Sequence, residues 1–369
     1  MIRTRTLEAL AAATRNGAVP RALVGLDGFV DLIVTPVGLR RGPGEDFAAI
    51  RTLPEFGQRV IGAAGKSTNI ELFPRAEKLG GNGPIMAGAL LAAGLDVAYV
   101  GALGRPQVHP VFAAFAERAR VFSLCSPAHT TALEFADGKL MLGTMRSLDE
   151  ISYARILEVM GEQTLAAELA AADLVALVNW TMIPQMTAIF AELVERHLPG
   201  LPAHPRRRFF FDLADPEKRT IDDLRRALAT MARFERFGRV TLGLNFKEAQ
   251  QVASALGCAP GTSDEPGLRQ LAAGVRAALA IDTVVVHPRD SAACATAAGA
   301  WWVSGPYTDR PVITTGAGDH FNAGFMVGQL LGLEPECCLM AGVCTSGHYV
   351  RSAQSPALSD LQTFLANWH

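Results

Sequence analysis

Cysteine is scarce in this chain, and its few cysteines are widely spaced. The 369 residues include six cysteines, none in a CxxC pair, so neither a disulfide framework nor a zinc ribbon is indicated. We expect these cysteines to be buried thiols in a reducing cytoplasm. The eight histidines also lack the paired spacing of metal ligands, which argues against a zinc site.

An excess of charge of one sign is absent as well, and so is any long apolar run. The formal net charge of −2 gives no basic field for nucleic acid or for an anionic membrane. No uncharged apolar stretch is long enough to span a bilayer. The amphipathic segment that begins with Arg3, Arg5 and Glu8 is unlike a signal peptide. We therefore expect a cytoplasmic protein that binds small molecules rather than nucleic acid or membrane.

The chain does contain enough apolar residues, 49%, for one large core. Strand-like runs at residues 173–180, 208–216 and 281–292 are separated by helical patterns. This alternation is typical of an α/β protein with a doubly wound, mostly parallel sheet.

The segment from Thr314 to Gly328, TTGAGDHFNAGFMVG, carries the clearest chemistry. Its small residues precede a helical pattern, and free N–H groups at a helix start favour an anion such as phosphate. A carboxylate at Asp319 would repel that ligand. Its presence is explained if Asp319 accepts the proton of a hydroxyl that attacks the phosphate. The alternative is a glycine-rich helix start in which Asp319 is a favourable first-turn charge.

A second glycine-rich helix start lies at residues 80–84, GGNGP. Backbone amides near Gly81 can approach a ligand, and the side chain of Asn82 can both donate to and accept from vicinal hydroxyls. The alternative is a helix start that only packs tightly on a sheet.

Polar side chains also follow or interrupt three strand-like runs. In the run 21–34, which Gly28 interrupts, Asp27 and Asp31 lie on one side of an extended chain and can face a crevice, although Asp27 can equally be a turn residue. Asp212 near the end of another run has the same two interpretations. Asn245 and Glu248 have the spacing of a helix capping box.

Together these motifs resemble those of the ribokinase-like (PfkB) carbohydrate kinases. That family carries Asp-Thr-x-Gly-Ala-Gly-Asp near its C-terminus; Thr314 and residues 316–319 match it, and Ile313 replaces the leading Asp. The Gly-Gly-rich motif at residues 80–83 and the Asn-x-x-Glu motif at residues 245–248 occur in the family's order. The resemblance extends over roughly residues 20–365.

The resemblance implies a ribokinase-like three-layer α/β/α sandwich forming a single domain over residues 1–369. It also implies a small β lid from about residues 40–75 and 128–147, the second containing a hairpin that turns at Asp137-Gly138. Within the first lid segment, strand-like pieces lie near residues 58–62 and 68–73. Lid strands sometimes pair between subunits in this family, so a homodimer is expected.

The same resemblance implies phosphoryl transfer from ATP to a sugar hydroxyl, with Asp319 as general base. The backbone amides that would hold the developing charge belong to Gly316, Ala317 and Gly318. The residues expected to bind the sugar are Asp31, with Asp27 as the alternative, Gly81 and Asn82.

Nucleotide and metal contacts are implied at the other end of the crevice. The expected nucleotide-binding residues are Asn245, Glu248, Thr314, Thr315 and Arg289. Asn245 and Glu248 would hold Mg²⁺ through water, and the residues in the 340s to 350s would border the adenine. The family's Thr-x-Gly-x-x-Gly nucleotide turn is replaced by residues 287–290, HPRD, which lack both glycines. ADP as donor, a nucleoside as acceptor, and an inactive sugar- or nucleotide-binding regulator therefore remain alternatives.

Activation by K⁺ is expected to be weak or absent. In many relatives the carboxylate that Ile313 replaces helps to form a monovalent-cation site. Activity would be compared in Na⁺, K⁺ and choline buffers of equal ionic strength. A large gain specific to K⁺ would contradict this expectation.

Overall fold

In the computed structural model, which describes residues 2–16 and 19–368, nine strands form the central sheet. They are β1 (Arg21–Leu26), β5 (Asp96–Gly101), β6 (Arg120–Ser123), β9 (Leu174–Leu177), β10 (Arg208–Asp212), β11 (Arg239–Leu244), β12 (Thr283–Val286), β13 (Ser291–Thr296) and β14 (Gly299–Ser304). Their spatial order is β14-β13-β12-β11-β10-β9-β1-β5-β6. Only the β12–β13 and β13–β14 pairs are antiparallel, which confirms the predicted mostly parallel sheet.

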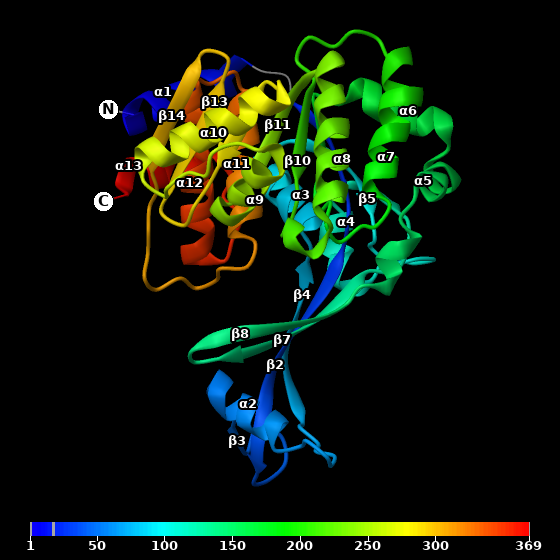
Figure 1. Cartoon of the computed structure of the whole chain (residues 1–369), viewed down its shortest axis with the longest axis vertical. Coiled ribbons are helices and arrows are strands. Elements are labelled where there is room, and N and C mark those ends of the chain that lie inside the picture. Colours follow the sequence, from blue (N-terminus) through cyan, green and yellow to red (C-terminus); the bar gives the residue numbers. More distant parts are fainter. Residues whose placement is uncertain (1, 17–18, 369) are drawn as a thin grey trace.

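Helices cover both faces of this sheet, so the predicted three layers are confirmed (Figure 1). One layer contains α5 (Tyr153–Met160), α6 (Glu162–Ala171), α7 (Met186–Glu192), α8 (Ile221–Ala232), α9 (Phe246–Leu256) and α10 (Glu265–Leu279). The other contains α1 (Ile2–Asn16), α3 (Asn82–Ala92), α4 (Ala113–Ala116), α11 (Ala317–Leu330), α12 (Pro335–Ser352) and α13 (Leu358–Asn367). Alternation along β10 shows the sandwich directly, because Phe209 and Phe211 enter the first layer's core and Phe210 enters the second.

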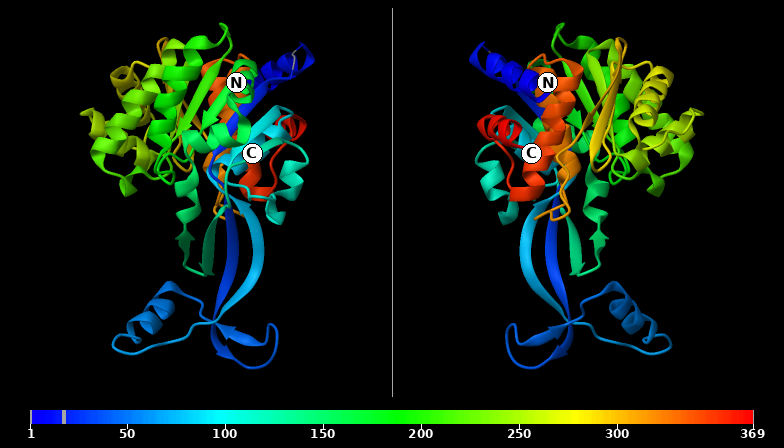
Figure 2. Two further views of the ribbon diagram at one scale, coloured as in Figure 1. Left: turned by 90° about the vertical axis from the view of Figure 1, so that its right-hand side faces the viewer. Right: turned by 90° about the vertical axis from the view of Figure 1, so that its left-hand side faces the viewer.

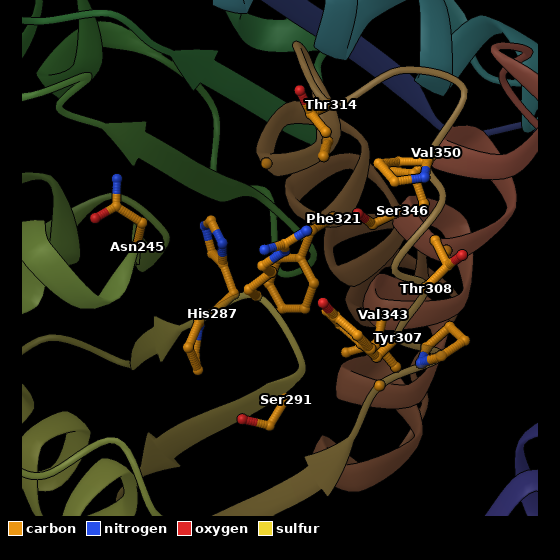
Figure 3. A pocket seen from close by; sticks show the side chains of 18 residues that line it. Asn245, His287, Ser291, Tyr307, Thr308, Thr314, Phe321, Val343, Ser346 and Val350 are labelled. Carbon is orange, nitrogen blue, oxygen red and sulfur yellow. The ribbon is translucent and has the colours of Figure 1, made fainter. Parts of the chain in front are cut away.

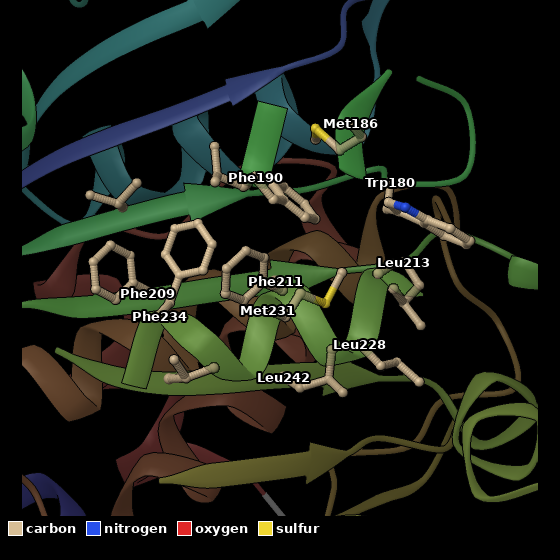
Figure 4. Close-up of a cluster of buried hydrophobic side chains, with 14 of the residues drawn as sticks. Trp180, Met186, Phe190, Phe209, Phe211, Leu213, Leu228, Met231, Phe234 and Leu242 are labelled. Atoms are coloured by element: carbon tan, nitrogen blue, oxygen red, sulfur yellow. The ribbon is translucent and has the colours of Figure 1, made fainter. Parts of the chain in front are cut away.

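Aromatic packing fixes β10 and the strands beside it (Figure 4). The ring of Phe234 lies edge-on to Phe209 and Phe211, with centroid distances of 5.0 and 5.1 Å. Phe190 packs against Phe211 at 5.1 Å. Edge-to-face contacts of this kind are favourable beyond the area that they bury. They hold rigid the strand that ends at Asp212, beside the candidate site.

A second, smaller sheet projects from the body as a stalk (Figure 2). It consists of β2 (Phe29–Arg40), β3 (Phe47–Ala49), β4 (Leu72–Gly80), β7 (Ala128–Phe135) and β8 (Gly138–Thr144), with α2 (Leu53–Ile61) at its tip. We call this unit the lid sheet. The expected lid segments 40–75 and 128–147 lie in it, and it also takes in the first part of β2 and the end of β4.

The chain passes from one sheet to the other at Asp27-Gly28, between β1 and β2. A β-carbon on Gly28 would overlap the carbonyl oxygen of Ala102, so no side chain fits at this crossing. The run predicted as one strand over 21–34 is therefore two strands in two sheets. For the same reason Asp27 and Asp31 do not share one face of an extended chain.

The strand predicted near residues 58–62 is wrong, because this segment belongs to α2. Thr52 and Glu55 form a capping box there: the Thr52 hydroxyl accepts from the Glu55 amide at 3.3 Å, and the Glu55 carboxylate accepts from the Thr52 amide at 3.3 Å. The apolar Val60 and Ile61 that suggested a strand are exposed on this helix.

All six cysteines are free thiols, and five are buried as the sequence predicted, whereas Cys258 is partly exposed. Among residues 2–16 and 19–368, no helix combines the length and the apolarity that crossing a membrane requires.

Candidate active site

The glycine turn before α11 is open toward a cavity. Gly316 has φ 86°, a conformation that favours glycine, and α11 begins at the next residue. A β-carbon on Gly318 would meet one neighbour, the ring of His287 at 3.4 Å, so the backbone there is otherwise accessible. The Gly318 amide can thus contact an anion directly, whereas the Ala317 amide already donates to the Thr314 carbonyl at 3.2 Å.

Asp319 and Asn82 bring the two glycine-rich helix starts together. The side-chain amide of Asn82 donates to the Asp319 carboxylate at 2.9 Å, a contact between residues 237 positions apart in the chain. Asp319 is only 7% exposed. The carboxylate therefore has a fixed orientation beside the glycine turn.

Asp27 holds the start of α3 in place. Its carboxylate accepts from the Asn82 amide at 2.9 Å, the Gly83 amide at 2.8 Å and the Asn179 side chain at 2.6 Å. Asp27 is fully buried, and protein donors occupy both of its oxygens. Its contacts support Asn82 and, through Asn82, Asp319.

Asp31 has a different environment, on β2 of the lid sheet. It lies opposite Thr130 of β7 and Lys78 of β4, and it is partly exposed. Burial raises its pKa, while a hydrogen bond from Thr130 and the positive charge of Lys139 act in the opposite direction. Of the two carboxylates that the sequence offered, Asp31 is the one that is open to a ligand.

Burial raises the pKa of four carboxyl groups near the glycine turn, those of Asp27, Asp212, Glu248 and Asp319. Burial, reinforced by the charges of Asp27 and Glu248, raises the pKa of Asp319 from its ordinary 3.8 to about 8. Burial also raises the pKa of Asp27 to about 6. The pKa of Asp212 is raised well above its usual range by burial and by the charges of Glu248 and Asp319. A cation or a set of hydrogen-bond donors that entered here would stabilise the ionised forms.

Asn245 and Glu248 do form the capping box that their spacing predicts. The Asn245 side chain accepts from the Glu248 amide at 2.9 Å, and the Glu248 carboxylate accepts from the Asn245 amide at 2.9 Å. The second Glu248 oxygen accepts from the Asp215 amide at 3.0 Å. Glu248 thereby ties the end of β10 to the start of α9.

Further polar side chains lie beside these carboxyl groups, those of Asp212, Asn322 and Asn179. We call these three side chains the polar floor of the crevice between the glycine turn and the lid sheet. The Asn322 side chain donates to Asp212 at 3.1 Å, while the other Asp212 oxygen and the Asn322 oxygen are buried without a partner. The site prediction did not include Asn322 or Asn179. Asn179 has a positive φ of 61° just after β9, and a polar residue at a strand's carboxyl end was the signal that could have identified it.

A cavity of about 400 Å³ adjoins the turn on the side of α12 (Figure 3). Its walls include Tyr307, Phe321, Val343 and Val350, and both Gly318 and Asn245 lie at its edge. The cavity thus has several apolar side chains in its wall and also reaches the glycine turn.

The replaced turn at residues 287–290 forms one wall of this cavity. The Nε2 atom of His287 is buried without a partner, and burial lowers the pKa of this histidine to about 4, so its ring is neutral. Arg289 also lines the cavity, and its guanidinium stacks on Tyr307 at 5.1 Å. Both side chains are near enough to contact a ligand in the cavity.

His320 and Tyr349 support the turn from behind. Their rings stack with centroids 3.5 Å apart. The Tyr349 hydroxyl donates to the Thr315 carbonyl at 3.0 Å, and Nδ1 of His320 donates to the Gly316 carbonyl at 2.8 Å. The other ring nitrogen of His320 pairs with Ser355, so both nitrogens are engaged and neither is free to act as a base.

Sequence comparison supplies the family context for this geometry. The model of the prokaryotic ketohexokinase family matches residues 4–368. The ketohexokinase of Haloferax volcanii is 30% identical over 350 residues, which cover 94% of this chain and 91% of that protein.

Solved structures share the fold at low sequence identity. A carbohydrate kinase from Agrobacterium tumefaciens has a TM-score of 0.63 at 16% identity, covering 94% of this chain and 97% of its own. A mutant of phosphofructokinase-2 from Escherichia coli has a TM-score of 0.62 at 13% identity, covering 95% and 99%. The ribokinase of Arabidopsis thaliana, solved with ribose and ATP, has a TM-score of 0.60 at 16% identity, covering 95% and 99%. The architecture is therefore the ribokinase fold, as the sequence motifs predicted.

Proposed function

Because this chain belongs to the prokaryotic ketohexokinase family and is a carbohydrate kinase of ribokinase fold, we propose that it uses ATP and Mg²⁺ to phosphorylate a hydroxyl of a ketohexose such as fructose. The observation that carries the mechanism is the 2.9 Å contact in which Asn82 orients Asp319 beside the glycine turn. The alternative acceptors, nucleosides and other sugars, are outcomes of the assay described below.

In the proposed step the sugar hydroxyl attacks the γ-phosphorus in line with the leaving nucleoside diphosphate. The oxygen–phosphorus bond to the sugar forms, the bond to the β-phosphate oxygen breaks, and Asp319 accepts the hydroxyl proton. The amides of Gly316 and Gly318 stabilise the charge on the transferred group, an effect that is often the largest single contribution to catalysis. The Ala317 amide joins them only if it leaves the Thr314 carbonyl, to which it donates at 3.2 Å.

We place the sugar between Asp31 of the lid sheet and the start of α3. Asp31 is the partly exposed carboxylate at this position, and Gly81 has φ 97° and no side chain to obstruct a hydroxyl. The Asn82 amide already donates to Asp319, so its remaining capacity can position the reactive hydroxyl near that base. A homodimer through lid strands stays a prediction.

The nucleotide occupies the cavity beside α12 in this proposal. The base lies between Tyr307 and Val343, and the phosphates extend toward Gly318. Thr314, Arg289 and the neutral His287 line the same cavity and supply further polar contacts.

The polar floor of the crevice fits a hard divalent cation. Asp212 has an unpaired buried carboxylate oxygen, and Asn322, whose side-chain nitrogen donates to the other Asp212 oxygen, has an unpaired amide oxygen. Within the described part of the chain, no three His, Cys, Asp or Glu side chains could hold a metal ion together. Mg²⁺ normally keeps several waters, so Asp212 together with Asn245 and Glu248 would hold it mainly through water. When bound, the ion would neutralise charge on the phosphates.

Two contacts support the expected weak response to K⁺. Ile313 brings no charge to the loop before the turn. The Tyr349 hydroxyl and the His320 ring already bind the carbonyl oxygens of Thr315 and Gly316, which would otherwise be available to a cation.

The test is nucleotide consumption with ketohexoses, aldohexoses, pentoses, sugar phosphates and nucleosides, each with ATP and with ADP. We expect turnover with ATP and a ketohexose that Asp319→Asn loses. Turnover with a nucleoside alone, or with ADP alone, would replace the corresponding part of the proposal. Ligand-induced stabilisation without turnover on any acceptor would favour a binding protein.

The value of kcat/KM is expected to rise with pH, and the apparent pKa of this rise should be far above the ordinary pKa of aspartate. Only the ionised Asp319 accepts a proton, and its pKa in the free protein is raised to about 8. Activity should therefore increase from pH 5 toward pH 8. Samples held at each pH and then assayed at pH 7.5 control for inactivation. A profile that is flat from pH 5 to pH 9 would rule out Asp319 as the titrating base.

A further inference from the structure

The hairpin of β7 and β8 carries a lysine on the same face of the lid sheet as Asp31. Asp31 pairs with Thr130 of β7, and Glu134 of β7 pairs with Lys139 of β8. Thr130 and Glu134 are four residues apart on one strand, so their side chains point to the same face, and cross-strand partners share that face. Lys139 therefore faces the crevice that Asp31 also faces.

Lys139 spans the gap between the lid sheet and the body. Its ammonium nitrogen lies 3.3 Å from the Thr315 hydroxyl, a contact between residues 176 positions apart. It also lies 3.0 Å from the carboxylate of Glu134, and its charge is felt at Asp31. The Lys139 side chain is 32% exposed, so the ammonium can move. The Lys139 ammonium thus lies between Asp31, the carboxylate proposed to bind the sugar, and the first residues of the glycine turn.

A positive charge at this position would compensate negative charge of the phosphate and of the buried carboxylates. Transfer requires Asp319 to be ionised beside a multiply charged phosphate, and burial together with the charges of Asp27 and Glu248 disfavours that ionised form. Among residues 2–16 and 19–368, Lys139 is the lysine or arginine whose side chain hydrogen-bonds the turn at residues 314–318. The competing interpretation is an ordinary cross-strand ion pair with Glu134, which would contribute little to stability and nothing to catalysis.

We propose that Lys139 is a catalytic residue of the lid sheet that binds the transferred phosphoryl group once both substrates are present. The ammonium exchanges Thr315 and Glu134 for γ-phosphoryl oxygens. It keeps its three protons while the sugar oxygen forms its bond to phosphorus, the nucleoside diphosphate leaves, and Asp319 takes the hydroxyl proton. This role rests on the proposed function of Asp319 and the turn.

Because the lid sheet carries the Lys139 ammonium, closure of the lid sheet is coupled to phosphoryl transfer. The cation reaches the phosphoryl group only when the hairpin lies over the crevice, and that position also shields the site from water. Transfer to the sugar is thereby favoured over hydrolysis, because an open site lacks both the sugar and the ammonium.

The experiment compares Lys139→Met and Lys139→Arg with Lys66→Met, an exposed lysine at the tip of the lid unit. Loss of one preorganised charge contact should lower kcat of Lys139→Met roughly 10- to 100-fold, with partial recovery in the arginine variant. The KM for the ketohexose should change less than kcat. Lys66→Met should match the unaltered protein in both constants. Melting temperatures check that each variant is folded.

A binding measurement separates this inference from the mechanism on which it rests. Calorimetry in the Asp319→Asn background, where both substrates bind but turnover is slow, should show with sugar present that Lys139→Met weakens binding of MgATP about tenfold more than binding of MgADP, since only ATP carries the γ-phosphoryl group. If the unaltered protein turns over a ketohexose and Lys139→Met does so equally well, this inference fails alone. If the unaltered protein phosphorylates no acceptor, the proposed function fails. If Lys139→Met weakens the binding of MgATP and MgADP equally, Lys139 does not contact the γ-phosphoryl group, and this inference fails as well. A rise in sugar KM without a change in kcat would overturn the assignment in favour of a sugar contact.

Discussion

Replacement of Asp319 by asparagine is expected to lower kcat by about 10²- to 10⁴-fold while sugar and nucleotide still bind. Asparagine cannot accept the hydroxyl proton, but its carbonyl oxygen can still accept from Asn82, so the local structure is retained. Steady-state kinetics would give kcat, and calorimetry would give both dissociation constants. Exposed Asp309, replaced in the same way, is the matched control. A variant that keeps more than a tenth of the original kcat would exclude Asp319 as general base.

The same variant should be more stable than the unaltered protein at neutral to alkaline pH. The pKa of Asp319 is about 8 in the folded chain and 3.8 ordinarily, so the folded state holds this proton more tightly. The stability that this provides is fully present below pH 3.8 and is lost as pH rises through 8. Asparagine, which is neutral at every pH, avoids that loss.

We expect a melting temperature about 2–5 °C higher for Asp319→Asn at pH 8, with the difference shrinking toward pH 4. Thermal unfolding in the absence of ligands over this pH range is the measurement. Equal melting temperatures at pH 8, with Asp309→Asn also unchanged, would show that Asp319 is ionised in the fold at little cost. A gain in stability with a loss of turnover would identify Asp319 as a group retained for catalysis.

The glycine turn and its neighbours were predictable because their function depends on local backbone geometry. Gly316 has a positive φ, and Gly318 leaves its backbone accessible, so the residue types themselves predict the geometry of this turn. Asp319 follows that turn directly. Asn82 was identified in the same way, from the glycines around it.

Contacts between distant segments were not predictable from local patterns. Asn179 and Asn322 come from a strand end and from the middle of a helix, and they meet Asp27 and Asp212 only in the folded chain. Lys139 looked like an ordinary residue after a hairpin turn, and its approach to Thr315 follows from the angle of the whole lid sheet. Such sites are set by the packing of the two sheets rather than by spacing along the chain.

The pair Asp27 and Asp31 shows where a sequence pattern misleads. The alternation of an extended strand put both carboxylates on one side, but the chain changes sheets at Gly28, where a side chain would overlap the Ala102 carbonyl. Asp27 stays with the body, buried among amides, and Asp31 goes with the lid sheet. Two carboxylates four residues apart therefore have separate tasks, and their alanine variants should differ.

Asp27→Ala is expected to destabilise the protein by about 3 kcal/mol at pH 7 and to abolish most activity. The two backbone amides and the Asn179 side chain would each lose a buried acceptor, at about 1–3 kcal/mol per donor. The pKa of this carboxylate is raised from 3.8 to about 6, so its removal relieves an unfavourable ionisation that costs roughly 3 kcal/mol of folding stability at pH 7. This gain does not offset the stability lost from the three unsatisfied donors. Without Asp27, Asn82 is no longer held and Asp319 loses its orientation.

Asp31→Ala should give the opposite pattern. Its carboxylate is partly exposed and receives no backbone donor, so unfolding free energy should change by less than about 0.5 kcal/mol. The KM for the ketohexose should rise about tenfold, because a hydrogen bond to a charged acceptor is lost. Denaturant unfolding and steady-state kinetics on both variants decide the matter. If Asp27→Ala were stable with a raised KM, and Asp31→Ala unstable, the assignment of the two carboxylates would be reversed, and the sugar would have to lie against the body rather than beneath the lid sheet.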